Sequence, residues 1–151
     1  MSEKEIKDKA LKLLSRREHS RLELRQKLLR RDFNFSEIEP VLDELAEKGY
    51  IDDERFAEEW IHSRKNSKPR GRFLLRAELK EKGVSSEIID DKLNSMISRS
   101  EEEEMAVELA RKWLRGKDRD QINIENKLSR YLYRKGFSRD IIRDVISNLS
   151  L

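Results

Sequence analysis

The side chains of this chain of 151 residues that could take part in catalysis have a spacing that fits no catalytic centre. The two histidines, His19 and His62, have no partner at metal-ligand spacing, and the absence of cysteine excludes disulfides and cysteine-based zinc sites. The segment 116–118 has a glycine and a lysine but lacks the rest of a phosphate-binding loop. No Ser/His/Asp or Cys/His constellation is visible. The sequence therefore predicts a protein that is not an enzyme and has no metal or cofactor.

The acidic run Glu101–Glu104 is the remaining candidate for a cation site. Four consecutive residues of a helix point in four directions, so they do not converge on one ion. Carboxylates are favoured in the first turn of a helix, where they face the positive end of its dipole. We expect this run to form the solvated first turn of a helix.

Lysines and arginines carry the strongest functional signal in the sequence. Arg72, Arg76 and Lys80 recur every four residues, which places them in one stripe of a helix, beside an inward face that holds Leu75 and Leu79. Cations spaced in this way suit a phosphate backbone or an acidic groove, although solvated faces paired with glutamate have the same pattern. The other basic residues of the predicted binding set are Arg64, Lys65, Lys68 and Arg70 before the stripe, and Arg21, Arg25, Lys127, Arg130 and Arg134 at corresponding places elsewhere.

The net charge of +3 hides a strong separation of charge along the chain. Residues 62–82 contain eight Lys or Arg and two Glu, whereas residues 36–59 contain two basic and ten acidic residues. Such a distribution predicts separate basic and acidic surfaces, which favour a polyanion or a protein with charges of both signs as the partner. No zinc finger or aromatic platform is visible, so any contact with nucleic acid should be electrostatic and insensitive to base sequence.

A repeated apolar pattern shows which elements must position these charges. Leu24, Leu75 and Leu128 start three segments that align without a gap, roughly 50 residues apart. Apolar residues match at the positions that follow, and the matched sets are Leu28, Leu79 and Leu132; Phe33, Val84 and Phe137; Ile38, Ile89 and Ile142; Leu42, Leu93 and Ile146; Leu45, Met96 and Leu149. Tandem units of this size stack to bury their apolar sides. We therefore predict an all-α protein of three tandem three-helix repeats, stacked into an elongated, curved rod, with domains at 1–50, 51–99 and 100–151.

Capping signals give the expected helix ends within each repeat. Ser20 with Glu23 and Ser36 with Glu39 have capping-box spacing, so each serine should open a helix. Asp52 or Asp53, Ser85 or Ser86, and Ser138 should cap later helices, and Gly49 should stop one.

Other residues have a predicted structural role. Gly83 and Gly136, which end the second helix of their repeats, are matched by Asp32, a residue type that tolerates the left-handed backbone. We expect the aromatic residues, Trp60 and Trp113 included, to pack in the cores.

The segment 50–58, Tyr-Ile-Asp-Asp-Glu-Arg-Phe-Ala-Glu, resembles the most characteristic stretch of the RecX family. A basic break containing Pro69 and Gly71 follows, and then Arg76, Leu79 and the run Lys82–Val84, in the same order as in that family. The resemblance covers essentially the whole chain. Asp32 in place of a glycine is a departure, as are Tyr131 and Tyr133, which interrupt the basic pattern of the third repeat.

The resemblance implies a function that composition alone does not give. RecX-like proteins lie along the groove of the RecA–DNA filament and restrain its ATPase, strand-exchange and coprotease activities, within recombination, DNA repair and the SOS response. They have no catalytic activity of their own. The expectation is thus a cytoplasmic monomer whose partners are the RecA filament and DNA, with no membrane partner, since no signal peptide or membrane-spanning run is visible. An autonomous, sequence-nonspecific DNA-binding module is the alternative, and a scaffold for another helical partner is a third possibility.

Overall fold

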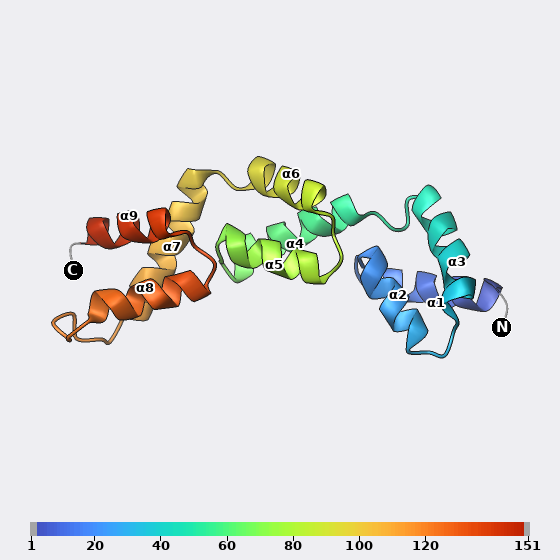
Figure 1. Cartoon of the computed structure of the whole chain (residues 1–151), viewed down its shortest axis with the longest axis horizontal. Helices are drawn as coiled ribbons and strands as arrows, with labels where there is room; N and C mark the ends of the chain where they lie inside the picture. The colour runs from blue at the N-terminus through green and yellow to red at the C-terminus, as the bar shows by residue number, and fades with distance from the viewer. Residues whose placement is uncertain (1–2, 150–151) are drawn as a thin grey trace. The chain divides into compact units, whose positions relative to one another are not determined.

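The computed structural model describes residues 3–149, and every regular element in this range is an α-helix (Figure 1). This result confirms the predicted all-α class. Within these residues, no helix combines the length and the apolar character that crossing a bilayer requires. The helices, in chain order, are α1 (Glu3–Leu14), α2 (Arg21–Leu29), α3 (Phe35–Glu47), α4 (Asp53–Ser67), α5 (Arg72–Glu81), α6 (Ser86–Met96), α7 (Arg99–Leu114), α8 (Ile124–Arg134) and α9 (Arg139–Leu149).

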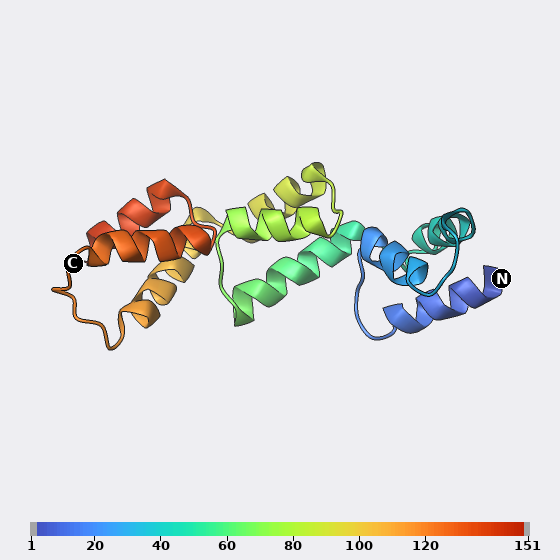
Figure 2. The ribbon, with the colours of Figure 1, turned by 60° about the horizontal axis from the view of Figure 1, so that its bottom comes forward.

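The chain divides into two compact units. The first contains the residues up to 60 and residues 79–92, and the second contains residues 61–78 and those from 93 onward. In the first unit, α1, α2 and α3 pack on one another, and in the second, α7, α8 and α9 do the same (Figures 1 and 2). Helices α4, α5 and α6 each contribute residues to both units.

Most of the aligned apolar positions form the cores, which confirms the repeat register, while Phe33, Met96, Ile146 and Leu149 are half-buried. Leu24, Leu75 and Leu128 are all buried, and so are the residues one helical turn later in each repeat. The core around α1–α3 consists of Ile6, Ala10, Leu13, Leu24, Leu28, Ile38, Val41, Leu42, Leu45 and Ile51. The buried residues of α7–α9 include Met105, Leu109, Leu114, Leu128, Leu132, Phe137, Ile141 and Val145. Helices this short are only marginally stable alone, and the burial of these side chains stabilises them.

The helix ends follow the predicted capping signals with one exception. The Ser20 hydroxyl accepts a hydrogen bond from the Glu23 amide, and the Glu23 carboxylate accepts one from the Ser20 amide, so this capping box is confirmed. The predicted box at Ser36 is wrong, because α3 begins earlier, with Asn34 at the N-cap and no side-chain cap. Glu39 is instead held by two arginines of α2.

Later caps agree with the sequence. Asp52 accepts hydrogen bonds from the amides of the first turn of α4, and Ser85 and Ser138 do so for α6 and α9. One further capping box, in which Ser98 and Glu101 open α7, was not anticipated. The glycines at the ends of α3, α5 and α8 have positive φ, and Asp32 has a φ of 67°, so its match with Gly83 and Gly136 is confirmed.

Adjacent repeats are joined by the same set of contacts in each unit. In the first unit, the Ser20 hydroxyl donates to the Lys82 carbonyl oxygen at 2.6 Å, and the Arg21 amide donates to the Asp53 carboxylate at 2.9 Å. In the second unit, the Gly71 amide, at the position that aligns with Ser20, donates to a carbonyl oxygen at 2.7 Å. That acceptor belongs to Lys135, which aligns with Lys82.

The second joint also repeats the carboxylate contact. There the Arg72 amide donates to Glu102 at 2.9 Å. A carboxylate from the first helix of one repeat thus caps the second helix of the repeat before it.

These capping carboxylates are partly or fully removed from water. Burial raises the pKa of Asp53 and of Glu102, and in both cases a backbone amide opposes the shift. Glu102 is only 4% exposed. The expectation that the whole acidic run 101–104 forms a solvated turn is therefore wrong for Glu102, which faces the start of α5.

Two substitutions at Asp53 should separate its capping role from its charge. Asp53→Ala removes the acceptor of the Arg21 amide and is expected to lower the free energy of unfolding by about 1 kcal/mol. Asp53→Asn keeps an acceptor oxygen and removes the buried charge, so near neutral pH it should be at least as stable as the parent. Because the pKa of Asp53 is raised in the folded state, the penalty for its ionised form disappears in acid, and so should the advantage of Asn.

Urea titrations followed by circular dichroism at neutral and acidic pH measure both effects. Equal losses for Asn and Ala at neutral pH would show that the carboxylate itself, rather than an acceptor atom, is required at this position.

The aromatic side chains are less buried than predicted. Phe56 and Phe137 lie in the cores, but Trp60 and Trp113 are only half-buried. Trp113 stacks on Tyr131 with ring centroids 6.0 Å apart, and the Lys117 ammonium lies 4.3 Å from the centroid of the indole ring. The Lys117 ammonium over the Trp113 ring remains in contact with water. The two tryptophans therefore line the edges of the cores.

Candidate basic interface

Helix α5 carries the central stripe of the predicted binding set. Arg72 is half-buried and held by its own repeat: its guanidinium donates to the Ile97 carbonyl oxygen at 3.3 Å and to the side chain of Asn94. Arg76 is also half-buried, whereas Lys80, near the end of α5, is exposed. The three residues lie on one helix at intervals of four, but only Lys80 is fully presented to solvent.

The segment before α5 contains two cations that are already paired. Lys65 forms an ion pair with Glu101 and donates to the Met96 carbonyl oxygen at 3.1 Å. Arg70 forms an ion pair with Glu78, and both side chains are less than one-fifth exposed. Arg64 is half-buried, whereas Lys68 is exposed, with no carboxylate within ion-pair distance among residues 3–149.

The two arginines of the first repeat are neutralised within their own unit. Arg25 binds Glu39 through two hydrogen bonds of 2.8 Å, and Arg21 reaches Asp43 at 2.6 Å and Glu39 at 3.4 Å. The hydrogen bonds that Arg25 donates to the Glu39 carboxylate lower the pKa of Glu39 and raise the pKa of Arg25. This is a fork-shaped pairing between α2 and α3, and it leaves little charge for a ligand.

The third repeat presents its basic residues differently. Lys127, Arg130 and Arg134 are all exposed, and none has a carboxylate within ion-pair distance in the part of the chain that the structure describes. Within the described residues, the single acceptor of Arg130 is the Asn126 carbonyl oxygen of its own helix, at 3.5 Å. On α9, which packs against α8, lie two more arginines that were not in the predicted set, Arg139 and Arg143. Their spacing of four residues was a visible signal for a second stripe.

The twelve predicted residues thus fall into three groups by environment. The function assigned to them stays a prediction, and the exposed group is the part of the set with charge available for a partner. Arg21, Arg25, Lys65 and Arg70 are in ion pairs; Arg64, Arg72 and Arg76 are half-buried; Lys68, Lys80, Lys127, Arg130 and Arg134 are exposed.

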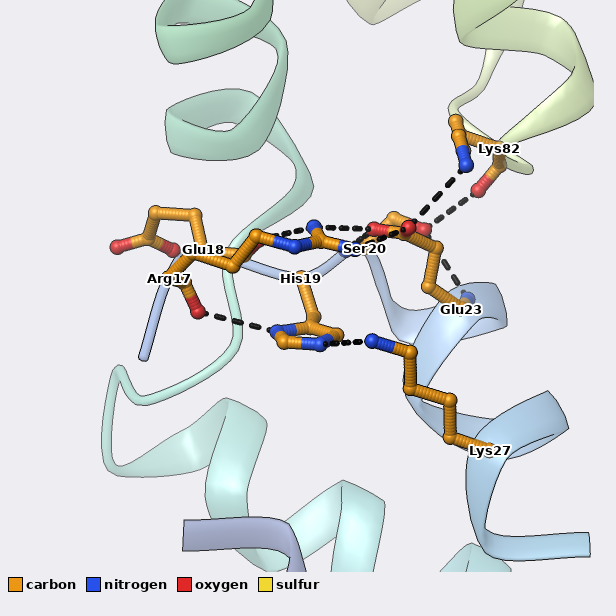
Figure 3. A network of polar contacts seen from close by, with 7 residues as sticks. All are labelled: Arg17, Glu18, His19, Ser20, Glu23, Lys27 and Lys82. Atoms are coloured by element: carbon orange, nitrogen blue, oxygen red, sulfur yellow. Dashed lines mark hydrogen bonds and ion pairs between the residues drawn. The ribbon is translucent and has the colours of Figure 1, made fainter. Parts of the chain in front are cut away.

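A buried polar network lies where α2 begins, next to the end of α5 (Figure 3). Glu23 is 7% exposed and accepts from Arg17 at 2.9 Å and from Lys82 at 3.2 Å, in addition to the Ser20 amide. Burial alone would raise the pKa of Glu23, but Arg17, the Ser20 amide and Lys82 outweigh it and lower that pKa to about 2. Glu23 is therefore ionised at any physiological pH.

The buried imidazole of His19 belongs to the same network (Figure 3). Its Nδ1 lies 3.0 Å from the Arg17 carbonyl oxygen, and its Nε2 lies 2.8 Å from the Lys27 ammonium. The carbonyl requires a proton on Nδ1, so Nε2 accepts from the lysine and the ring is neutral. Burial lowers the pKa of His19, in agreement with this assignment. Its role is structural, and among residues 3–149 no group of three potential metal ligands is found.

Comparison with protein families gives one answer along the chain. Models of the first, second and third three-helix domains of RecX match residues 7–45, 52–93 and 101–146. The chain is 37% identical to the regulatory protein RecX of Chlorobium phaeobacteroides, over 97% of this chain and 95% of that protein. It is 34% identical to the regulatory protein RecX of Mycolicibacterium smegmatis, over 96% of this chain and 79% of that protein.

Solved structures agree with the sequence relatives. The crystal structure of RecX from Lactobacillus salivarius matches 98% of this chain with a TM-score of 0.87 at 28% identity, and 96% of that protein is covered. Three consecutive domain matches, relatives above one-third identity over nearly the full length and the same fold all point one way: this chain belongs to the RecX family of regulatory proteins.

Proposed function

We propose that this chain regulates the RecA recombinase by binding the RecA–DNA filament and restraining its ATPase, strand-exchange and coprotease activities. Membership of the RecX family across all three domains carries the proposal. On this view the protein is a monomer that acts in the cytoplasm and performs no chemistry itself. The exposed lysines and arginines would contact DNA phosphates or acidic surfaces of the filament.

A titration of RecA ATP hydrolysis tests this function. In the presence of single-stranded DNA, turnover should fall when this protein is added at well below one molecule per RecA protomer, because one molecule bound along a filament affects several protomers. Unchanged turnover at equimolar protein would contradict the proposal. ATP hydrolysis by the protein alone is the control.

Exposed cations of α8 favour a second candidate, an autonomous DNA-binding module without sequence preference. Lys127, Arg130 and Arg134 are exposed and have no ion-pair partner among residues 3–149. Binding to bare DNA would then weaken steeply with salt, since each phosphate contact releases roughly one counterion. Affinities for bare DNA and for the filament at two salt concentrations separate the candidates: preference for the filament at about physiological salt supports the first.

A further inference from the structure

Helices α8 and α9 lie side by side in the second unit (Figure 2). An open groove of about 970 Å³ runs along them. Four arginines line it, Arg130 and Arg134 from α8 and Arg139 and Arg143 from α9, against a single carboxylate, Glu125. Each helix contributes two arginines four residues apart. Like charges at this spacing repel each other, so the arrangement costs the free protein stability.

Little within the described chain offsets this repulsion. Arg130, Arg134 and Arg139 have no carboxylate within ion-pair distance among residues 3–149, and Arg143 pairs with Asp140 in an exposed contact. Exposed pairs of this kind contribute little to stability. An anionic occupant would relieve the repulsion, and among residues 3–149 only Glu125 lines the groove with the opposite charge.

The repeat itself shows that the fold does not require these arginines. The aligned positions in the second repeat are Ala77, Glu81, Ser86 and Asp90, and those in the first are Gln26, Arg30, Phe35 and Glu39. All three repeats pack with the same buried register. Four arginines at these positions are therefore a property of the third repeat alone.

The groove also has an apolar surface, which a ligand bound through its charge alone would leave uncovered. Tyr133 lines it and is 61% exposed, Ile146 is half-buried, and Ile142 lies beneath. Tyrosine and arginine are enriched at the centres of protein interfaces. A phosphate backbone needs only the cations, whereas an amphipathic peptide can place apolar side chains on Ile146 and Tyr133 and carboxylates beside the arginines.

We propose that the α8–α9 groove is a docking site for an acidic, amphipathic helical segment of a partner protein. This goes beyond the proposed function, because the groove would accept such a segment whichever protein supplies it. The groove runs along helices of 11 residues, roughly 16 Å, so the segment would need about three turns. Its carboxylates would contact Arg130 and Arg134 on one side and Arg139 and Arg143 on the other.

The test uses the full chain and a fluorescent synthetic helix with leucine at i, i+3, i+4 and i+7 and glutamate elsewhere. Fluorescence anisotropy should show binding of this peptide, and the double variant Arg134→Glu, Arg139→Glu should weaken it on the order of tenfold or more. The matched control is Arg30→Glu, Arg31→Glu, which makes the same charge change at exposed positions in the first repeat, one of them aligned with Arg134, and should leave binding unchanged. Tyr133→Ala should also weaken binding.

Three outcomes would overturn the proposal. Equal binding by the two double variants would show that only net charge matters. Equal binding of a scrambled peptide of the same composition would exclude recognition of an amphipathic face. The third outcome concerns a poly-dT oligonucleotide. If it displaces the peptide, binds at least as tightly, and binds the α8–α9 double variant more weakly than the parent, the groove is a nucleic-acid site. Thermal unfolding of each variant confirms that the fold is retained.

Discussion

Gly136→Ala is expected to destabilise the joint between the second and third repeats by about 3 kcal/mol or more. A Cβ at this position would lie 2.5 Å from the Leu74 backbone nitrogen and 2.5 Å from its Cβ. The backbone also has a φ of +93°, which costs a residue with a side chain roughly 1–2 kcal/mol before any clash. Overpacking adds about 1–3 kcal/mol, a large share of the 5–15 kcal/mol that typically holds a domain together.

Gly116→Ala is the matched control for this effect. Gly116 has a similar φ of +74°, but a Cβ there would have no atom within 4 Å. The control therefore carries the backbone strain alone, and the difference between the two variants in urea denaturation reports the close approach of the repeats. Equal losses in the free energy of unfolding for the two variants would show that the contact between α5 and the α8–α9 turn does not contribute to stability.

Glu23→Gln is expected to lower the free energy of unfolding by about 3 kcal/mol near neutral pH. The figure follows from the fall in the pKa of Glu23 from 4.5 to about 2, at roughly 1.4 kcal/mol for each pH unit. The neutral amide cannot balance Arg17 and Lys82, both of which would keep their charge beside a buried site. Glu47→Gln, at an exposed position, makes the same change in charge and should have little effect.

The pH dependence gives this prediction its sign. A carboxyl group with a lowered folded-state pKa stabilises the protein above its unfolded pKa and loses that contribution as pH falls through the folded value. The difference between parent and Glu23→Gln should therefore be full above about pH 4.5 and shrink towards zero near pH 2. Acid-sensitive groups away from this network, such as Glu44, are shared by both proteins and cancel in the difference. Urea midpoints measured across this range check it, and a pH-independent difference would exclude the charge as its cause.

The sequence predicted the helical repeat well because its signals are local or periodic. The aligned leucines are buried in every repeat, and Asp32 takes the left-handed backbone of its glycine counterparts. The cap at Ser20 forms because its partner lies three residues away. At Ser36 the same spacing failed, since Glu39 is held by Arg21 and Arg25 from another helix.

The candidate site was harder to predict, because the availability of a charge depends on contacts between helices. Nothing local in the sequence shows that Lys65 meets Glu101 or that Arg25 meets Glu39, and helix spacing alone does not tell a paired arginine from an exposed one. The domain boundaries at 50/51 and 99/100, the elongated curved shape and the common alignment of the basic stripes stay predictions.

The joints between repeats restrict how such a chain can be lengthened or rebuilt. In each one a main-chain carbonyl, of Lys82 or Lys135, accepts a hydrogen bond from the repeat before it, and a main-chain amide, of Arg21 or Arg72, donates one to a carboxylate of the repeat after it. The fixed requirements are a glycine after the second helix of the incoming module and an acid near the start of its first helix. A designer who adds a fourth module would have to supply those two features together with the buried apolar register of the repeat.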